Sequence, residues 1–376
     1  MTLRLVVYDV AWRRVGAVES LTSASGVSVC NGVSSLTFAV DNDTPYGQGL
    51  ASPGTRLELF DDGALVQAFR VPEYVIDLPR ETGQVTVKAV GFDDLLDRLT
   101  GYPEPTKTIP SGTVGTFASD YDTRGGAKPF ETAAKGIIAD AAARLGEPVT
   151  VVASQGRGPS YSAQVRSDNL ADLLYPDADK AGMVITVGPT AGHDGYLVDV
   201  VPRGSIGFVI TEASGLIEKG TVRITEPKVT RVLAGGQGEK ADRQFYALTS
   251  PGRESAWGVA KEKFRDARDA ADTATLAKRA QESMDEGAAS YTVSLSLREA
   301  EGFRWRDGYE VGDAVQIRIG DLLITDWIRR VEWSWSKNDG FTARPIIGDA
   351  AGDPLQEVTR SVGALVARDR RWKART

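Results

Sequence analysis

The chain has 376 residues and a formal net charge of −7 at pH 7; 41% of its residues are hydrophobic and 25% are charged. This length is typical of two or three domains that each bury a core, and the acidic balance argues against a protein that grips nucleic-acid phosphates. Cys30 is the only cysteine, so the sequence excludes an intrachain disulfide and a thiolate metal cluster. No apolar run is long enough to span a bilayer, so we expect no membrane insertion.

The first hundred residues predict a β region that ends in a short helix. Residues 1–10 alternate as a strand and do not form a charged segment followed by an apolar one, so we expect no signal peptide and synthesis in a cytoplasm. Asn31-Gly32, a pair typical of a type I′ turn, separates the next two strands. The predicted strands are 1–10, 27–30, 36–40 and an antiparallel meander of 56–60, 65–77 and 84–90, and apolar spacing predicts the helix at 91–99.

The middle of the chain predicts a small α/β insert. Residues 101–128 are rich in Gly, Pro, Thr and Ser, which favours a long loop that a partner could order. The clearest helix is 130–145, which Gly146 ends. Ser167 is the expected N-cap of a second helix, which Pro176 should kink or split. The predicted strands of the insert are 149–152, 183–187 and 196–201.

The chain then returns to β structure and repeats the meander. Residues 314–319, 321–336 and 341–348 form the last three strands, with a hairpin turn at Asp339-Gly340. Their pattern matches the first meander, which favours two related β modules, although any two antiparallel meanders share some features. Between the insert and this meander the sequence predicts strands at 208–211, 221–225, 229–233, 244–248 and 290–297, and a helix near 272–287.

The C-terminal segment 353–376 predicts a basic amphipathic tail. Its apolar residues at helical spacing are Val358, Val362, Leu365 and Val366, and its basic end includes Arg370 and Arg371. A helix that docks on a neighbouring subunit explains the apolar stripe, so these six residues are the candidate subunit interface. Contact of the basic end with DNA or with anionic lipid is the alternative.

Residues with catalytic or metal-binding potential lack the partners that such sites need. His193, the only histidine, lies in a predicted hairpin tip without a nucleophile motif, so a solvated turn residue is favoured over a catalytic base. Asp120 and Asp122 have the spacing of a calcium loop, but the remaining ligand positions do not fit. We therefore expect no catalytic residue, no metal and no cofactor.

Two further motifs have both a functional and a structural interpretation. The Gly-rich residues 235–240 lack the spacing of a phosphate-binding loop, so a turn between strands is favoured. Trp327, Trp333 and Trp335 could form a sugar-binding platform, but aromatic residues on a strand face more often pack in a core or an interface.

Three motifs in fixed order give the chain a resemblance to a known family. They are the strand–helix joint at 87–98, the Gly-rich turn at 234–239 with Asp242-Arg243 after it, and the segment 309–313. From Met1 to about Gly348 the chain resembles the minor tail proteins of siphovirus phages that infect actinobacteria, which are similar to the baseplate-hub or tail-tip family. Pro176 and Lys240 depart from the family pattern and affect local details.

The resemblance implies an α+β, mainly β fold with two β-barrel-like hub domains and trimeric assembly. The expected domains are a hub domain at 1–100, a loop at 101–129, the α/β insert at 130–206, a second hub domain at 207–352 and the tail at 353–376. Three chains with two similar modules each place six modules around an axis. Such a ring can adapt a sixfold tail tube to a threefold tip at the distal end of the virion tail and line the DNA channel.

The same resemblance implies a non-enzymatic structural protein that serves host attachment and genome ejection. Its expected partners are two further copies, the distal tail protein ring, the tape measure protein and other minor tail or tip proteins. Phage DNA would pass without specific binding, because an acidic wall does not hold phosphate. A tail-associated cell-wall hydrolase and a carbohydrate-binding host-recognition protein are the alternatives.

Overall fold

The computed structural model describes residues 3–18, 21, 23–41, 50, 52–78, 83–118, 127–162, 165–238, 242–270, 272–320, 322–336 and 338–348. They form two compact units. Unit 1 contains the described residues of Met1–Lys219 and Leu295–Ala350, and unit 2 contains those of Gly220–Ser294. The chain is mainly β with a minority of helix, as predicted. Within the ranges above, no helix is both long and apolar enough to cross a membrane.

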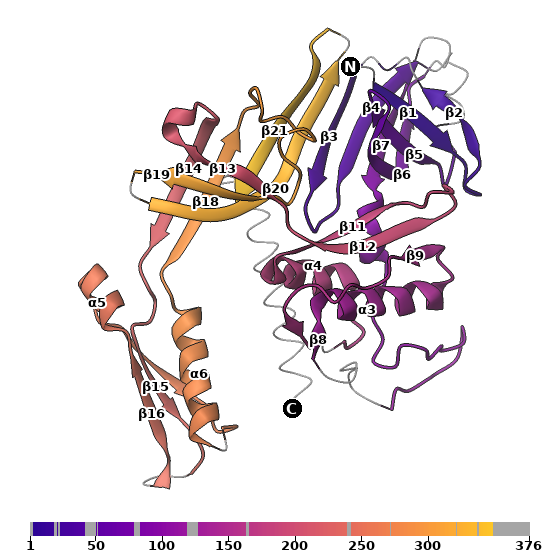
Figure 1. The fold of residues 1–376 in the computed structure, drawn as a ribbon. Helices are drawn as coiled ribbons and strands as arrows, with labels where there is room; N and C mark the ends of the chain where they lie inside the picture. Colours follow the sequence, from indigo (N-terminus) through magenta and orange to yellow (C-terminus); the bar gives the residue numbers. More distant parts are fainter. Residues whose placement is uncertain are drawn as a thin grey trace. The chain divides into compact units, whose positions relative to one another are not determined.

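The first β module is built by the N-terminal strands of unit 1 (Figure 1). Apolar residues on alternate positions of these strands form its core, because side chains of a strand point to opposite faces in turn. The predicted meander is observed in the last three strands. The elements are β1 (Leu3–Tyr8), β2 (Arg14–Val18), β3 (Ser23–Val29), β4 (Ser35–Asp41), β5 (Arg56–Asp61), β6 (Ala64–Ile76) and β7 (Gln84–Gly91), followed by η1 (Phe92–Asp94) and α2 (Leu95–Arg98).

The α/β insert follows, and two helices cover its small three-stranded sheet (Figure 1). Phe92 and the leucines of α2 join the buried apolar core of the insert, so this core extends up to the first β module. The elements are β8 (Lys128–Pro129), α3 (Phe130–Leu145), β9 (Val149–Val151), β10 (Ser160–Tyr161), α4 (Leu170–Ala181), β11 (Met183–Pro189) and β12 (Tyr196–Pro202).

The second β module completes unit 1 and contains the second predicted meander. The long strand β20 pairs with β19 through its first half and with β21 through its second half. The elements are β13 (Ser205–Thr211), η2 (Glu212–Ser214), β14 (Ile217–Thr225), β18 (Ser290–Leu297), β19 (Ala314–Ile319), β20 (Leu322–Ser336) and β21 (Gly340–Gly348). The chain passes from unit 1 into unit 2 within β14 and returns within β18.

Unit 2 is a three-stranded sheet with one long helix packed against it. The helix α6 (Thr273–Glu286) is the one predicted near 272–287, and the Asp272 side chain caps it by accepting from the Thr275 backbone N–H. Leu276, Ala280 and Met284 of α6 join a buried cluster with Val232 of the sheet. The other elements are β15 (Arg231–Gly235), β16 (Phe245–Thr249), α5 (Pro251–Trp257) and β17 (Glu262–Asp266), of which α5 and β17 were not predicted.

The two β modules have the same strand order. In the first module the order is β3-β4-β7-β6-β5-β1, and in the second it is β14-β18-β21-β20-β19-β13. Each of these six strands therefore has a counterpart in the other module, and the counterparts follow one another in the same order along the sequence; β2, which pairs with β1, has no counterpart. The outermost pair differs, because β1 is antiparallel to β5 whereas β13 is parallel to β19. This order supports the prediction of two related modules.

The strand registers of the two meanders are also equivalent, except at the end of β5, where the pairing with β6 shifts between Leu59 and Phe60 whereas the pairing of β19 with β20 does not shift. Arg56 faces Arg70 in the first module as Ala314 faces Trp327 in the second. Further along the same strands, Glu73 faces Lys88 as Arg330 faces Ile346. In each module the register shifts just before this last pair, where the central strand carries an irregularity. The common register extends the likeness of the modules from strand order to individual residues.

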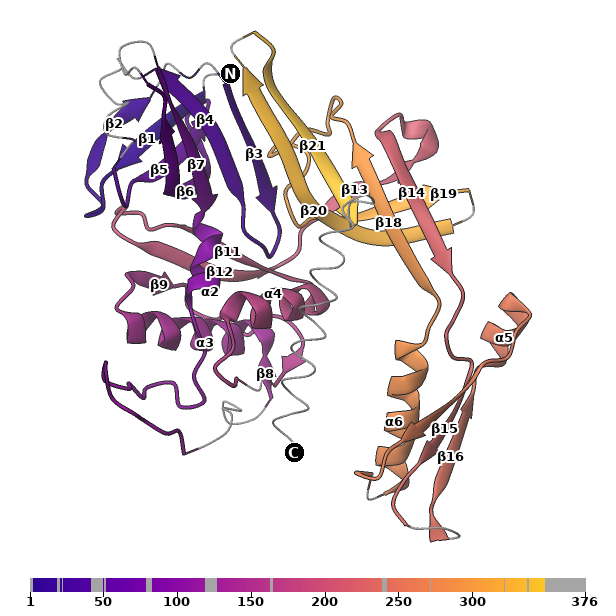
Figure 2. The same ribbon diagram turned by 180° about the vertical axis from the view of Figure 1, so that it is seen from behind.

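Strand β3 joins the two modules into one thirteen-stranded sheet. It pairs antiparallel with the second half of β20, from Arg330 opposite Val29 to Ser336 opposite Ser23 (Figure 2). Among the described strands this sheet has three ends, at β14, β2 and β13, and its pairings do not close into a ring. The expected β-barrel-like shape of each hub domain is therefore not confirmed.

Two local predictions were wrong. Asn31 has φ 48°, but Gly32 does not have a positive φ, so these residues do not form a type I′ turn. The connection between β3 and β4 is longer because the Asn31 side chain binds the insert: its Nδ2 donates to Asp179 Oδ1 at 2.8 Å, and its Oδ1 accepts from the Ile185 backbone N–H at 2.9 Å.

The second wrong prediction concerns helix α4. Its N-cap is Asn169 and not Ser167, since the Asn169 side chain accepts from two backbone N–H groups of the first turn. Pro176 does not split the helix, which continues to Ala181. Leu174 and Ala178 on either side of the proline are buried in the core of the insert, and this packing supports the helix where one backbone hydrogen bond is lost.

Candidate functional site

Small hydroxyl side chains cover one face of the sheet where the two modules meet. The face is formed by five adjacent strands, β7, β4, β3, β20 and β21. Backbone pairing places Thr37 opposite Ser25, Ser25 opposite Ser334, and Ser334 opposite Thr342, so these four lie in one row across the seam. We call the following set the hydroxyl face: Ser23, Ser25, Thr37, Thr86, Ser334, Ser336 and Thr342.

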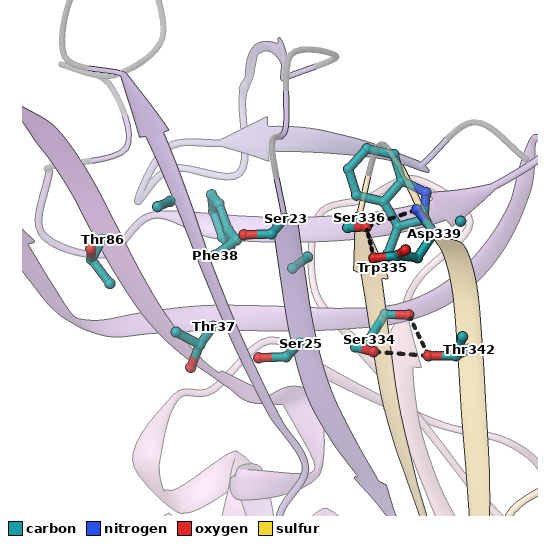
Figure 3. Close-up of a pocket in the computed structure, with 13 residues that line it drawn as sticks. Ser23, Ser25, Thr37, Phe38, Thr86, Ser334, Trp335, Ser336, Asp339 and Thr342 are labelled. Carbon is teal, nitrogen blue, oxygen red and sulfur yellow. Dashed lines mark hydrogen bonds between the residues drawn. The ribbon is translucent and has the colours of Figure 1, made fainter.

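The hydroxyl face borders a shallow cavity of about 350 Å³ (Figure 3). Its hydroxyls bind one another or the nearby turn: the Ser334 and Thr342 hydroxyls are 2.8 Å apart, and Ser336 Oγ donates to Asp339 Oδ2 at 2.8 Å. Among the described residues that border the cavity, Asp339 is the one with a charge. Hydroxyl groups and carbon atoms of the side chains line the cavity together.

The same strands explain why this face is polar. Leu36 and Val40 of β4, Val87 of β7 and Trp333 of β20 are buried in the core of the first module. Residues next to them along each strand must point away from that core. Around the cavity most of these residues are serine or threonine, whereas Lys88 and Glu332 are charged neighbours on the same face. Alternation thus produces one apolar face and one polar face, whose part around the cavity carries short hydroxyl side chains.

The chemistry of the hydroxyl face is that of a passive wall. Neutral hydroxyls exchange hydrogen bonds with water and offer no fixed charge to a phosphate. The nearest charged pair along the row, Glu73 and Lys88, is a mutual ion pair with a 2.6 Å contact. In the part of the chain that the structure describes, His193, the one histidine, binds Glu58 and none of these hydroxyls.

His193 is at the predicted hairpin tip but makes a specific contact that the sequence did not predict. Its Nδ1 lies 2.6 Å from Oε1 of Glu58, a buried carboxylate on β5. Tyr8 donates its hydroxyl to Oε2 of the same carboxylate at 3.0 Å and stacks on the imidazole. Burial and the Glu58 charge raise the pKa of Tyr8 to about 12. The three side chains join the insert to the first module. Because His193 and Glu58 are far apart in the sequence, no local pattern could have predicted their contact.

The Gly-rich turn and Trp333 have structural roles. Gly235 ends β15 and Gly236 follows it, and their carbonyls accept hydrogen bonds from the Arg243 guanidinium. Trp333 is only 3% exposed and stacks on Phe341, with the ring centres 5.7 Å apart. A buried Trp333 cannot serve an exposed sugar platform.

The other predicted sites lie outside the described residues. This holds for Asp120 and Asp122 and for the six interface residues of the tail, Val358, Val362, Leu365, Val366, Arg370 and Arg371. In the described ranges, no group of three or more His, Cys, Asp or Glu side chains is arranged to hold a metal ion.

The family comparison identifies the class of protein to which this sheet architecture belongs. The chain belongs to the family described as Siphovirus ReqiPepy6 Gp37-like protein, whose family model matches residues 4–349. This match confirms the resemblance to a siphovirus tail-protein family. A search of curated proteins found no match.

Two solved structures share the fold over almost their whole length. The 43 kDa tail protein of prophage MuSo2 from Shewanella oneidensis is 11% identical, with a TM-score of 0.52 over 92% of this chain and 97% of that one. The prophage tail protein gp18 from Listeria monocytogenes EGD-e is 12% identical, with a TM-score of 0.52 over 97% of this chain and 99% of that one. At such low identity, what these proteins share with this chain is the fold.

Proposed function

We propose that the chain is a structural component of a phage tail tip that forms a trimeric hub ring. The observation that carries the proposal is the pair of β modules with one strand order and one register in a single polypeptide. Three copies would present six similar modules around one axis, which allows a threefold object to fit a sixfold tube. Membership of the siphovirus family and the shared fold of two prophage tail proteins agree with this role.

In this proposal the two modules correspond to hub domains at 1–100 and 207–352, joined through the loop 101–129 and the insert 130–206. The ring contacts the distal tail protein ring, the tape measure protein and other minor tail or tip proteins at the distal end of the tail. Its work is done by subunit interfaces during host attachment and genome ejection, with no catalytic step.

The hydroxyl face is the proposed lining of the DNA channel. Passing DNA carries a dense row of phosphates, and basic side chains would retain it through ion pairs. Short neutral hydroxyls keep the wall wetted without such pairs, and the net charge of −7 disfavours retention further. A lumen rich in lysine and arginine in the assembled tail would exclude this part of the proposal.

The tail segment 353–376 is proposed to dock on a neighbouring subunit through Val358, Val362, Leu365 and Val366. The double change Leu365→Asp and Val366→Asp should then weaken assembly, whereas Thr359→Asp with Ser361→Asp, which adds the same charge at polar positions between the apolar ones, should not. Light scattering of both variants beside the unmodified chain measures the difference. Equal assembly of all three proteins would remove the tail from the interface.

Counting copies tests the central proposal. Light scattering of the purified chain, together with imaging of assembled tails without imposed symmetry, should give three copies that form one ring with six similar lobes. The trimeric hub would be contradicted if the chain were a monomer in solution and if assembled tails also contained one copy or six copies of it.

A further inference from the structure

The second half of β6 has an edge that no strand covers in the described part of the chain. Pairing of β5 with β6 ends at Arg70, whereas β7 continues beside β6 as far as Ile76. Residues 73–76 are therefore hydrogen-bonded to a strand on one side only. An exposed strand edge of this kind offers unpaired backbone groups to another chain.

The counterpart of this edge in the second module is occupied. Residues 330–333 of β20 correspond to 73–76 of β6, because Arg330 and Glu73 hold the same place in the two equivalent registers. On β20 this edge pairs with β3 of the first module. The pairing of β3 with β20 is thus an example, within one chain, of how a strand of another module pairs with such an edge.

The irregular positions before the two edges are equivalent as well. The Val71 backbone N–H donates to the Thr55 carbonyl at 2.9 Å, as the Ile328 N–H donates to the Asp313 carbonyl at 2.9 Å. The next residues are Pro72 and Arg329. The backbone carbonyl of Arg329 accepts a hydrogen bond from the Cys30 N–H at 2.9 Å. Proline lacks a backbone N–H but has the same carbonyl acceptor. Pro72 therefore does not remove the group that this contact uses.

The strand order identifies the occupant. Strand β3, which covers the edge of β20, is the counterpart of β14. Among the described strands β14 pairs only with β18 and ends the sheet, and most of its residues are exposed. We propose that β14 of a second copy of this chain pairs with the free edge of β6, as β3 pairs with β20 within one copy.

This inference rests on the proposed ring and specifies how it closes. Each copy would offer one β6 edge and one β14 edge, so the contact is head-to-tail and closes after three copies if every joint has the same rotation. Exposed apolar residues lie on both strands: Val75 of β6 is 45% exposed and Ile224 of β14 is 50% exposed. Pairing of the strands would cover part of both.

Disulfide trapping tests the pairing directly. In a Cys30→Ala background the chain has no other cysteine, so Val75→Cys can be combined with a single cysteine at each position from 217 to 225 in turn. Residues directly opposite in an antiparallel pair have Cβ atoms about 4.5–5.5 Å apart, close enough for a disulfide. We expect covalent dimers and trimers on a non-reducing gel for one position of β14 and its nearest same-face neighbours.

Two control pairs calibrate the experiment. Ser25→Cys with Ser334→Cys tests the observed β3–β20 pair, in which these residues are opposite, and should give a bond within one chain. Val15→Cys replaces a valine that is 50% exposed on the edge strand β2, so it matches Val75 in residue type and exposure. Combined with the same β14 series, it should give no cross-linked trimer.

The outcomes separate this inference from the proposed function. A trimer by light scattering that no Val75 pair cross-links, while the Ser25–Ser334 pair forms, overturns the β6–β14 joint and leaves the hub proposal standing. A chain that is never trimeric overturns both. A Val75 cross-link confined to single chains also overturns the joint, since β14 would then return to its own β6.

Discussion

Asp93 is a partly buried carboxylate beside the turn that joins β3 to β4. Burial raises its pKa to about 6, although the Ser34 backbone N–H and hydroxyl both donate to it and oppose the rise. An acid with a raised pKa in the folded state binds its proton more tightly there than when unfolded. Stability is therefore largest below the unfolded pKa and falls as the pH rises towards 6.

Replacing Asp93 should remove this pH dependence. The rise in pKa from 3.8 to about 6 corresponds to at most about 3 kcal/mol of stability lost across that range. In Asp93→Asn the loss should shrink, because no proton leaves the side chain. Urea unfolding of both proteins between pH 4 and pH 7 measures the difference, and parallel curves would show that Asp93 does not titrate in this range.

Glu131 presents the opposite case. It is fully buried at the start of α3, and hydrogen bonds from Arg157, with further ones from Lys135 and the Gln155 backbone, hold its pKa far below the usual range. Glu131→Ala should cost about 3–5 kcal/mol, because it leaves the buried Lys135 and Arg157 partly unpaired. Glu226→Gln, in an exposed pair with Lys261, is the control and should change stability by less than about 1 kcal/mol. Similar unfolding midpoints for the two variants would contradict the role of Glu131.

Sequence reasoning reached few of these individual contacts. Alternation and spacing identify which residues are buried, but Glu58–His193 and Asn31–Asp179 join residues far apart in the chain. Nothing in either local segment marks the partner. His193 was therefore assigned to solvent, and Asn31 to a turn type that its side-chain hydrogen bonds exclude.

At the scale of elements, the seam between β3 and β20 depends on a glycine. A Cβ at Gly26 would lie 2.4 Å from the indole of Trp333 and 2.6 Å from the Ser35 carbonyl oxygen. Gly26→Ala should therefore separate the strands and cost on the order of 1–3 kcal/mol, as overpacking does elsewhere. Gly188→Ala, where a Cβ meets nothing within 4 Å, should fold as stably as the unmodified chain. Thermal unfolding compares them, and an unchanged midpoint for Gly26→Ala would be evidence against close packing at the seam.

The sheet and helix of unit 2 are inserted in one strand-to-strand connection of the second module. The counterparts β3 and β4 are joined by residues 30–34, whereas β14 and β18 are joined by residues 226–289, which contain the whole of β15 to α6. Replacing 226–289 by a short turn should leave the fold of unit 1 intact, since its sheet already contains both flanking strands. Circular dichroism and the unfolding midpoint of the shortened chain test this. Loss of cooperative unfolding would show that unit 1 requires the segment.

The two meanders were predictable because turn residues and period-2 alternation are local signals. The pairing of β3 with β20 was not, since strands separated by most of the chain carry no mutual signal in one sequence. The hydroxyl face was missed for the same reason. Its seven serines and threonines are spread over five strands, and only the strand pairing brings four of them into one row.

For the whole molecule, the important quantity is charge along the proposed channel. Ser25→Lys with Ser334→Lys would place two ammonium groups per copy on the hydroxyl face. Phage that carry this change should release DNA more slowly, and the delay should grow at low ionic strength, where phosphate contacts are stronger. Val10→Lys with Val15→Lys adds the same charge at exposed positions elsewhere and should not alter release. Unchanged kinetics in the first variant would indicate that this face does not meet the DNA.

The position of unit 2 has a consequence for how such chains diversify. A segment attached at one strand-to-strand connection can be lengthened, exchanged or lost while the pairing around it is kept. Relatives with the same sheet would then differ mainly in what they carry between the counterparts of Thr225 and Ser290.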